Sequence, residues 1–178
     1  MFDICVTRKK FNNFAFCFFG KIRVLPMPKR GYSATRSLGE GVKASGRNLR
    51  ISPKAAREIC TAIRHMKLDE ARTYLQDVID MKRPVPYRRY KKEVPHKAGL
   101  DGWYAGRYPV KASKEILKVI NSLEANCEDQ GLDVERLKIV HAAAQKGRVL
   151  KRFIPRAFGR SSPHYDCFCH VEVFAEEV

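Results

Sequence analysis

The chain has 178 residues, of which 35 are Lys or Arg and 19 are Asp or Glu, so its formal net charge at pH 7 is +16. This length corresponds to one domain, and 44% of apolar residues is enough for a compact core. Self-repulsion of this size destabilises an isolated fold, so the composition implies an anionic partner, either nucleic acid or an anionic membrane surface. The six cysteines lack the spacing of a disulfide framework, which argues against a disulfide-stabilised scaffold and indicates reduced thiols in the cytosol.

The basic residues are concentrated in particular tracts. Residues 1–50 contain 11 cations and 2 acids, and residues 82–114 contain 10 cations and 2 acids. Most acids lie instead in residues 58–80, 124–135 and 172–177, which are interpreted as ordinary domain surface. Charge gathered in tracts is typical of a nucleic-acid-binding surface.

Residues 1–41 are predicted to be a basic N-terminal extension, followed by a single domain over residues 42–178. The run "RKKFNNFAFCFFG" mimics a secretion signal, but two asparagines interrupt it and no small-residue cleavage site follows. It is also too short to span a bilayer, which takes ~20 residues. The run "MPKRGYSATRS", which begins at Met27, is similar to the basic N-terminus of a cytosolic protein. Residues 1–26 are therefore predicted to be either an extension from an early start codon or a family-specific tail.

Three helices follow a short extended segment at residues 42–51. The first begins at the Ser52–Pro53 pair, where Ser is a favoured N-cap and the missing N–H of Pro costs nothing. The second covers about residues 68–81, after a break of one or two residues that predicts a tight corner. The third covers residues 111–130 and has a glycine as C-cap. Cys60 and Cys127 fall on the apolar stripes of these helices and are predicted to be buried.

Two strands complete the predicted domain. In "RLKIVHAAAQ", alternation places Leu137, Ile139, His141 and Ala143 on one face of the strand. The terminal run "DCFCHVEVFAEEV" has apolar residues on both faces, so both faces are expected to be partly covered. The order of elements predicts an α+β fold, in which three helices pack on one face of a small antiparallel sheet.

Residues 82–109 are rich in proline and glycine and show no apolar period, so no regular element is predicted there. Four tyrosines and one tryptophan alternate with the basic residues of this segment. Aromatic and arginine side chains together suit contacts with RNA backbone, sugars and bases. Trp103 taken alone is instead assigned to packing on its own domain.

The segment "KGRVLKRFIPRAFGRSSP", residues 146–163, joins the last two strands and has six cations, no acid and five bulky apolar residues. Such strands normally connect through ~2–5 residues, so a long protruding β-hairpin is predicted, with a reach of ~30 Å for ~10 residues per strand. A ribbon of this length is marginal in water alone. We expect it to thread through folded RNA, where its cations meet phosphates and its apolar side chains fill gaps between ribose and bases. A disordered basic loop is the alternative.

Other functional classes find weaker support. The run "HYDCFCH" offers four candidate metal ligands, but on a strand Cys167 and Cys169 would lie on one face and His170 on the other, without the paired spacing of a zinc site. Cys167 also lacks a paired base for nucleophilic catalysis. We therefore predict no enzymatic activity, metal or cofactor. The helices carry balanced charge, which favours neither a DNA recognition helix nor a basic membrane-surface helix.

Several motifs in a fixed order carry a resemblance to a known family. The runs "GRNLRISPKAAREI", "ARTYLQDVIDMKRPVPYRRYKKEVPHK", "GWYAGRYPVKASKEILK" and "LDVERLKIVHAAAQKGRVLKRFIPRAFGRSSP" resemble the universal large-subunit ribosomal protein number twenty-two, which is seventeen in eukaryotic counting. The insert at residues 82–109 is similar to the archaeal and eukaryotic branch, and "GWYAGRYP" to its archaeal members. The resemblance covers about residues 42–178 and does not extend to residues 1–26. Cys169 departs from it, since the family often has Thr before this His.

The resemblance implies a structural ribosomal protein without catalytic activity, located in the cytoplasm in the large ribosomal subunit. Its body would bind large-subunit rRNA early in assembly near the exit of the peptide tunnel, and its hairpin would line the tunnel wall. The implied partners are rRNA, neighbouring ribosomal proteins and the nascent polypeptide in transit, with no membrane and no small-molecule substrate. The tip matches the family pattern PRA-x-GR, so the resemblance implies that the tunnel-lining residues are Arg156, Ala157, Phe158, Gly159, Arg160 and Ser161.

The basic residues of the tracts are the candidates for contact with rRNA phosphates. A different RNA-binding protein, outside the ribosome, is the alternative function. The candidates are Arg47, Arg50, Lys54, Arg83, Arg88, Arg89, Lys91, Lys92, Arg107, Lys111, Lys146, Arg148, Lys151, Arg152, Arg156 and Arg160.

Overall fold

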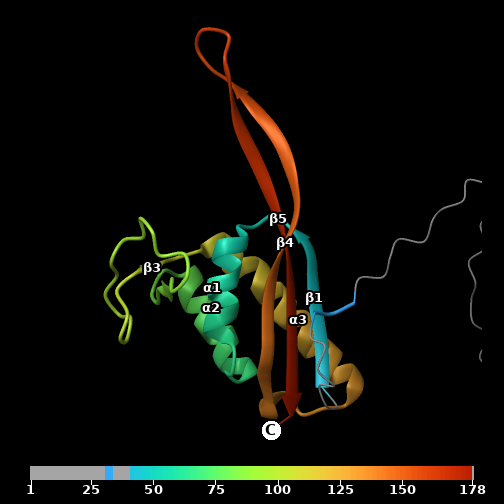
Figure 1. The fold of residues 1–178 in the computed structure, drawn as a ribbon. Coiled ribbons are helices and arrows are strands. Elements are labelled where there is room, and N and C mark those ends of the chain that lie inside the picture. The colour runs from blue at the N-terminus through green and yellow to red at the C-terminus, as the bar shows by residue number, and fades with distance from the viewer. Residues whose placement is uncertain (1–30, 34–40, 178) are drawn as a thin grey trace, which may run out of the picture. The chain divides into compact units, whose positions relative to one another are not determined.

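The sheet is built from the first strand and the last two strands of the domain. In the computed structural model, β1 (Gly41–Leu49), β4 (Leu137–Pro155) and β5 (Ser161–Glu177) form an antiparallel sheet in the order β1-β5-β4 (Figure 1). The C-terminal strand is therefore central, and it holds together segments from both ends of the domain. Together with the three helices described below, this antiparallel sheet confirms the predicted α+β class.

The structure describes residues 31–33 and 41–177. Of these, residues 32–33 and 41–177 belong to one compact unit. Residues 1–26, for which two explanations were offered, lie outside the described residues. The boundary proposed at residue 41 stays a prediction, because the residues just before it are also outside the described part.

Three helices provide the other layer. They are α1 (Pro53–Ile63), α2 (Leu68–Ile79) and α3 (Val110–Gln130), and a single turn of 3₁₀ helix, η1 (Val134–Arg136), precedes β4. α1 packs against β4, α3 packs against β1 and β5, and α2 packs against α3. The predicted start at Pro53 is confirmed, and so is the glycine C-cap, since Gly131 has a left-handed φ of 72°.

The connection between α1 and α2 differs from the prediction of a tight corner after one or two residues. Four residues separate Ile63 from Leu68. The N–H of His65 donates to the carbonyl of Ile139 at 2.7 Å, and the N–H of Ile139 donates to the carbonyl of Met66 at 2.9 Å. The connection is longer than predicted because it pairs with the free edge of β4 instead of turning directly into the next helix.

The core lies between the helices and one face of the sheet. Cys169, Val171, Val173 and Ala175 of β5 are fully buried on this face, opposite the apolar stripes of the helices. Cys60 and Cys127 are also buried, as their positions on the stripes predicted. The core residues that β1 and β4 contribute on the same face of the sheet are Val42, Ala44, Leu137, Ile139 and Ala142.

The predicted alternation in β4 is wrong after Ile139. Ile139 is paired with Ala175, but the next pair is His141 with Phe174, so one extra residue forms a β-bulge. The bulge exchanges the two faces of the strand from that point on. As a result Ala142 is buried against the helices, while His141 and Ala143 lie on the opposite face of the sheet.

The second face of β5 is covered as well, which agrees with its lack of alternation. Glu172 and Phe174 are buried on this face. The Glu172 carboxylate accepts hydrogen bonds from the backbone N–H and the hydroxyl of Ser33, at 2.8 and 2.7 Å. Lys43 of β1 lies 5.5 Å from the centroid of the Phe174 ring. The interpretation of Glu172 as a surface acid is therefore wrong.

Candidate nucleic-acid interface

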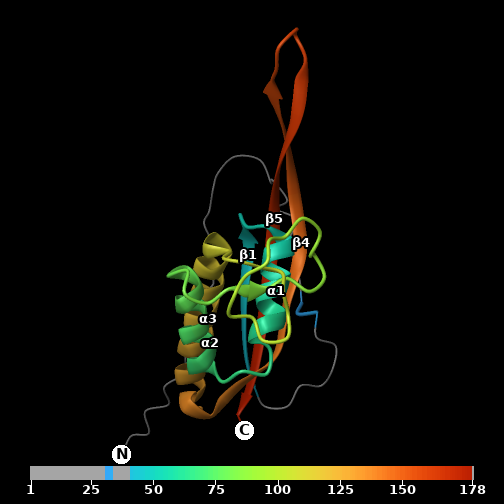
Figure 2. The same ribbon diagram turned by 90° about the vertical axis from the view of Figure 1, so that its left-hand side faces the viewer.

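The arm, defined as residues 146–163, continues β4 and β5 beyond the body (Figures 1 and 2). The ladder runs without a break from the pair Val149–Cys167 to the pair Pro155–Ser161, and every side chain from residue 151 to residue 161 is exposed. The predicted protruding hairpin is confirmed. It has no protein core, since none of its residues belongs to the buried cluster.

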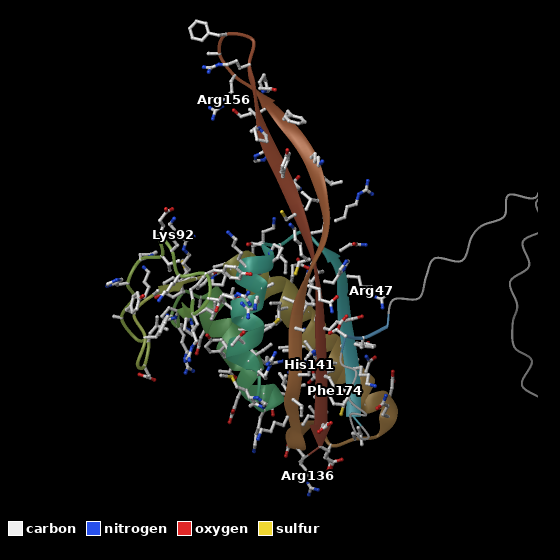
Figure 3. All side chains as sticks on the ribbon, viewed as in Figure 1. Arg47, Lys92, Arg136, His141, Arg156 and Phe174 are labelled. Atoms are coloured by element: carbon white, nitrogen blue, oxygen red, sulfur yellow. The ribbon has the colours of Figure 1, made fainter. Side chains whose placement is uncertain are left out.

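The five residues between the strands form the turn at the tip of the arm. The N–H of Arg156 donates to the carbonyl of Arg160 at 2.8 Å and closes the turn. Gly159 has a φ of 62°, a conformation that favours glycine, and Phe158 beside it has a φ of 57°. The Phe158 side chain is 94% exposed. Arg156, at the start of the turn, lies at the end of the arm that is far from the body (Figure 3), so the turn holds a large apolar ring away from the rest of the protein.

Apolar side chains also lie along the arm among its cations. Phe153 is 62% exposed and Ile154 is 44% exposed. The Phe153 ring contacts the Tyr165 ring edge-on, with 6.3 Å between centroids. Exposed apolar groups between basic side chains are typical of a surface that another molecule covers.

The base of the arm contains an ion-pair network that the sequence did not predict. Asp166 on β5 pairs with Arg50 at 2.9 Å and with Arg152 at 3.5 Å. The hydrogen bond from Arg50, together with the charges of both arginines, lowers the pKa of Asp166. Two of the candidate RNA-binding cations are therefore partly neutralised within the protein. Asp166 was overlooked because it lies three residues beyond the basic segment, opposite Leu150 in the ladder.

The basic segment 82–109 forms a loop whose ends are joined by a small ladder. β2 (Val85–Pro86) pairs with β3 (Gly106–Arg107), and an isolated bridge joins His96 to Ala105. The prediction that this segment has no regular element is therefore wrong for these two short strands. Two-residue strands show no period, so a sequence pattern cannot reveal them.

A buried carboxylate fixes the backbone of this loop. Glu58 of α1 is buried and accepts hydrogen bonds from the backbone N–H groups of Arg88, Arg89 and Tyr90, at 3.0, 3.2 and 3.3 Å. It belongs to the acids that were interpreted as surface, so that interpretation is wrong for Glu58. By satisfying three amides, it directs the basic side chains of this run outward, where Arg88 and Arg89 are exposed.

Trp103 packs on its own loop, as predicted. Its indole N–H donates to the carbonyl of Tyr87 at 3.0 Å, and its ring stacks on Tyr104 with 5.1 Å between centroids. The guanidinium of Arg88 and the ammonium of Lys91 lie 5.9 and 5.7 Å from the Trp103 ring. The aromatic residues therefore hold the cations of the loop in place.

Two adjoining grooves bring several candidate residues together. The arm groove, with a volume of about 720 Å³, lies between the start of α1 and the base of the arm, and the loop groove, of about 570 Å³, lies between α1 and the basic loop. Both are lined by Ser52, Lys54 and Tyr90. The candidate cations that line them are Arg50, Lys54, Lys111 and Lys146 in the arm groove, and Lys54, Arg89, Lys92 and Arg107 in the loop groove.

The remaining candidates do not join these grooves. Arg47, at the end of β1, lies on the far side of the arm base from Lys92, as Figure 3 shows. Arg83 lies over the ring of Tyr74, 5.0 Å from its centroid. The other candidates outside the grooves lie on the basic loop, namely Arg88 and Lys91, or along the arm, namely Arg148, Lys151, Arg152, Arg156 and Arg160.

Within residues 31–33 and 41–177, no group of three or more His, Cys, Asp and Glu side chains is arranged to hold a metal ion. His170, one of the ligand candidates in "HYDCFCH", accepts a hydrogen bond at Nδ1 from the backbone N–H of Asn48 at 3.0 Å. Among the helices of the described residues, none has both the length and the hydrophobicity that crossing a membrane requires.

Residues 44–176 match the family model of ribosomal protein L22p/L17e. The chain belongs to this family. The matched range includes the arm, both grooves and the basic loop, so these features all lie within the L22p/L17e domain.

Relatives place the chain on the archaeal side of the L22p/L17e family, as the resemblance of the motifs predicted. The chain is 52% identical over 153 residues to the large ribosomal subunit protein uL22 of Archaeoglobus fulgidus, an alignment that covers 85% of this chain and 99% of that protein. It is 48% identical over 154 residues to the protein of the same name from Methanocaldococcus jannaschii, covering 86% and 99%. For Methanopyrus kandleri the identity is 54% over 136 residues, covering 76% and 86%.

Proposed function

We propose that this protein is a structural constituent of the large ribosomal subunit in the cytoplasm, without enzymatic activity. Its body binds large-subunit rRNA and aids assembly beside neighbouring ribosomal proteins, and its arm lines the tunnel through which the nascent polypeptide passes. Two findings support a place in the large ribosomal subunit: membership of the L22p/L17e family, and relatives that are named as large ribosomal subunit proteins.

The exposed arm is the observation on which the proposal depends most. A two-stranded ribbon is marginal in water, and here its cations repel one another while Phe153, Ile154 and Phe158 are exposed. Folded RNA removes both problems, because phosphates neutralise the cations and ribose and base edges cover the apolar side chains. The tip, with its outward Phe158, is then the part left to face the tunnel.

The experiment shortens the arm at a position that the register defines. Replacing residues 151–165 by Asn-Gly leaves Leu150 opposite Asp166 and supplies the residues of a tight two-residue turn. The shortened chain is expected to enter large subunits, because the grooves and the basic loop are retained. Photoreactive groups on a stalled nascent chain should then lose their crosslinks to this protein deep in the tunnel.

Two results would contradict the proposal. Deep crosslinks that persist with the shortened chain would show that the arm does not face the tunnel. A full-length chain that sediments with other RNA, and not with large subunits in a sucrose gradient, would favour the alternative of an RNA-binding protein outside the ribosome.

A further inference from the structure

The arm groove contains a cation that was not among the candidates. Arg57 lies in the second turn of α1 and lines the groove. Its Nη1 atom is buried and has no hydrogen-bond partner among the described residues, and its guanidinium lies 5.8 Å from the centroid of the Tyr90 ring. A guanidinium carries five N–H donors, and leaving a buried one unpaired costs free energy. The Nη1 donor therefore lies beside the groove without an acceptor among the described residues.

The charge around Arg57 is strongly unbalanced. Of the other cations that line the groove, Lys54, Lys111 and Lys146 form no ion pair with any described residue. Among the described residues that line the groove, Asp166 is the only acid, and it already has two arginine partners. An anion in this groove would therefore meet several uncompensated positive charges.

Two helices add to the positive field. α1 begins at Pro53 and α3 begins at Val110, and Figures 1 and 2 show both beginning at the end of the body from which the arm projects. Ser52, which precedes α1, could cap that helix but forms no side-chain capping hydrogen bond with it, and Pro109, which precedes α3, has no side-chain group that could do so. A helix N-terminus carries about half a positive charge and has N–H groups without partners inside the helix, so both helix ends favour a phosphate at this position.

The walls of the groove suit more than a phosphate. Tyr90 and Tyr165 contribute aromatic rings, and Ile51 and Ala144 contribute apolar surface. A volume of about 720 Å³ is that of a small-molecule site and much exceeds the size of one phosphate. Aromatic rings next to basic groups are what RNA-binding proteins offer to a base that has left its helix.

We propose that the arm groove binds one unstacked RNA nucleotide, whose phosphate meets Arg57, Lys54 and Lys111 and whose base packs against Tyr90. This inference rests on the proposed function, because the natural source of the nucleotide is then large-subunit rRNA. It assigns to Arg57 a contact that fixes the position of the RNA at the point where the arm leaves the body.

The test measures binding of the full chain to a ten-nucleotide single-stranded RNA that carries one 2-aminopurine. Arg57→Gln is expected to weaken binding about tenfold, as for the loss of one charge-assisted contact. It should also reduce the slope of log K against log salt by about 0.7, the value for one single-strand phosphate. Arg136→Gln is the matched control, since Arg136 lies at the opposite end of the body (Figure 3) and should change binding less than twofold.

Two further variants separate charge from stacking. Arg57→Lys keeps the charge and should retain the salt slope, which also covers the case in which the Gln variant does not fold. The emission of 2-aminopurine falls when the base stacks, so wild type and Tyr90→Phe should quench it and Tyr90→Leu should not.

Three outcomes would overturn the inference. Equal losses for Arg57→Gln and Arg136→Gln would mean general attraction to a basic surface. Unquenched 2-aminopurine with the wild-type chain would mean that no base enters the groove. Normal RNA binding by Arg57→Gln, combined with loss of a neighbouring ribosomal protein from the subunit, would mean that a protein occupies it. Failure of the full chain to enter large subunits would instead count against the proposed function.

Discussion

Glu58 shows how one residue organises a binding surface. Its carboxylate is the acceptor for three backbone N–H groups of the basic loop, and it is buried against the protein. Glu58→Ala leaves these donors without their acceptor, so we expect the free energy of unfolding to fall by about 2–3 kcal/mol. Urea denaturation followed by circular dichroism measures this change, and limited trypsin digestion should cut after Arg88 and Arg89 faster than in wild type.

The control for this prediction is Glu128→Ala. Glu128 is an exposed acid at the end of α3, and its removal should change the free energy of unfolding by no more than about 0.5 kcal/mol. If Glu58→Ala is as stable as the control and its loop resists trypsin equally, the carboxylate does not hold the loop.

The buried thiols make a prediction about pH. Burial raises the pKa of Cys60 from 9.0 to about 12 and the pKa of Cys169 to about 11. Because the fold favours the neutral thiols, their contribution to stability is fully present below pH 9 and is lost as the pH rises through about 11 to 12. Iodoacetamide at pH 8.5 should therefore leave both residues unmodified in the native chain and label them in urea.

Cys167 provides the internal comparison for this measurement, since it is partly exposed on the same strand. Mass spectrometry of the labelled peptides should find Cys167 modified before Cys169. Rapid labelling of Cys60 in the native chain would mean that α1 opens readily and that its burial is not maintained in solution.

At the scale of elements, the junction of β1 with the arm is controlled by Asp166. Asp166→Asn removes the charge that holds Arg50 and Arg152, so both become available for phosphates. We expect tighter binding to large-subunit rRNA and a salt slope that is steeper by about 0.9 for each phosphate gained. The pKa of Asp166 is lowered in the fold, so its ion pairs are intact at pH 7 and are lost only as the pH falls below its ordinary value of 3.8.

Asp133→Asn is the matched variant for Asp166→Asn, because Asp133 pairs with Arg136 at 3.7 Å and lies outside the grooves and the arm. Filter binding over a series of salt concentrations gives both slopes. Equal slopes for the two variants would indicate that Arg50 and Arg152 stay bound to the protein surface when RNA is present.

Elements with local signals could be predicted from the sequence, and elements that depend on distant partners could not. The start of α1 is marked by Pro53, and the end of α3 is marked by Gly131. The arm could be predicted because its length and charge fit no ordinary loop. The bulge after Ile139 could not, since it depends on the pairing of His141 with Phe174 more than thirty residues away.

The candidate site was predictable to a similar extent. The basic tracts are visible in the composition, but the way α1 and α3 direct their starts into one groove is a property of the fold. Glu58 and Asp166 were missed because the residues that they bind are distant in the chain. The sequence contained one signal that could have revealed Glu58. Glu58 is next to Ile59 on the buried side of α1, and a charged residue buried there needs a partner.

At the scale of the whole molecule, the candidate RNA-binding cations of the described residues are divided between the body and the arm. The grooves and the basic loop belong to the body, which has its own core, whereas the arm contributes cations without any core. The basic loop and the part of the arm beyond Leu150 share no ion-pair partner among the described residues, so their contributions to the binding free energy are expected to add.

This independence can be measured through the salt dependence of rRNA binding. With ~6–10 phosphate contacts, the affinity of the full chain should fall by ~10³–10⁵ between 50 and 200 mM salt. Replacing Arg88, Arg89, Lys91 and Lys92 by Gln should lower the slope, and so should replacing residues 151–165 by Asn-Gly, which removes four cations. Combining both changes should lower the slope by the sum of the separate effects, whereas Gln at Glu176 and Glu177 should not lower it. A nearly flat salt dependence of the full chain would mean that its cations are only solvated, and a combined effect well below the sum would mean that the body and the arm share the same phosphates.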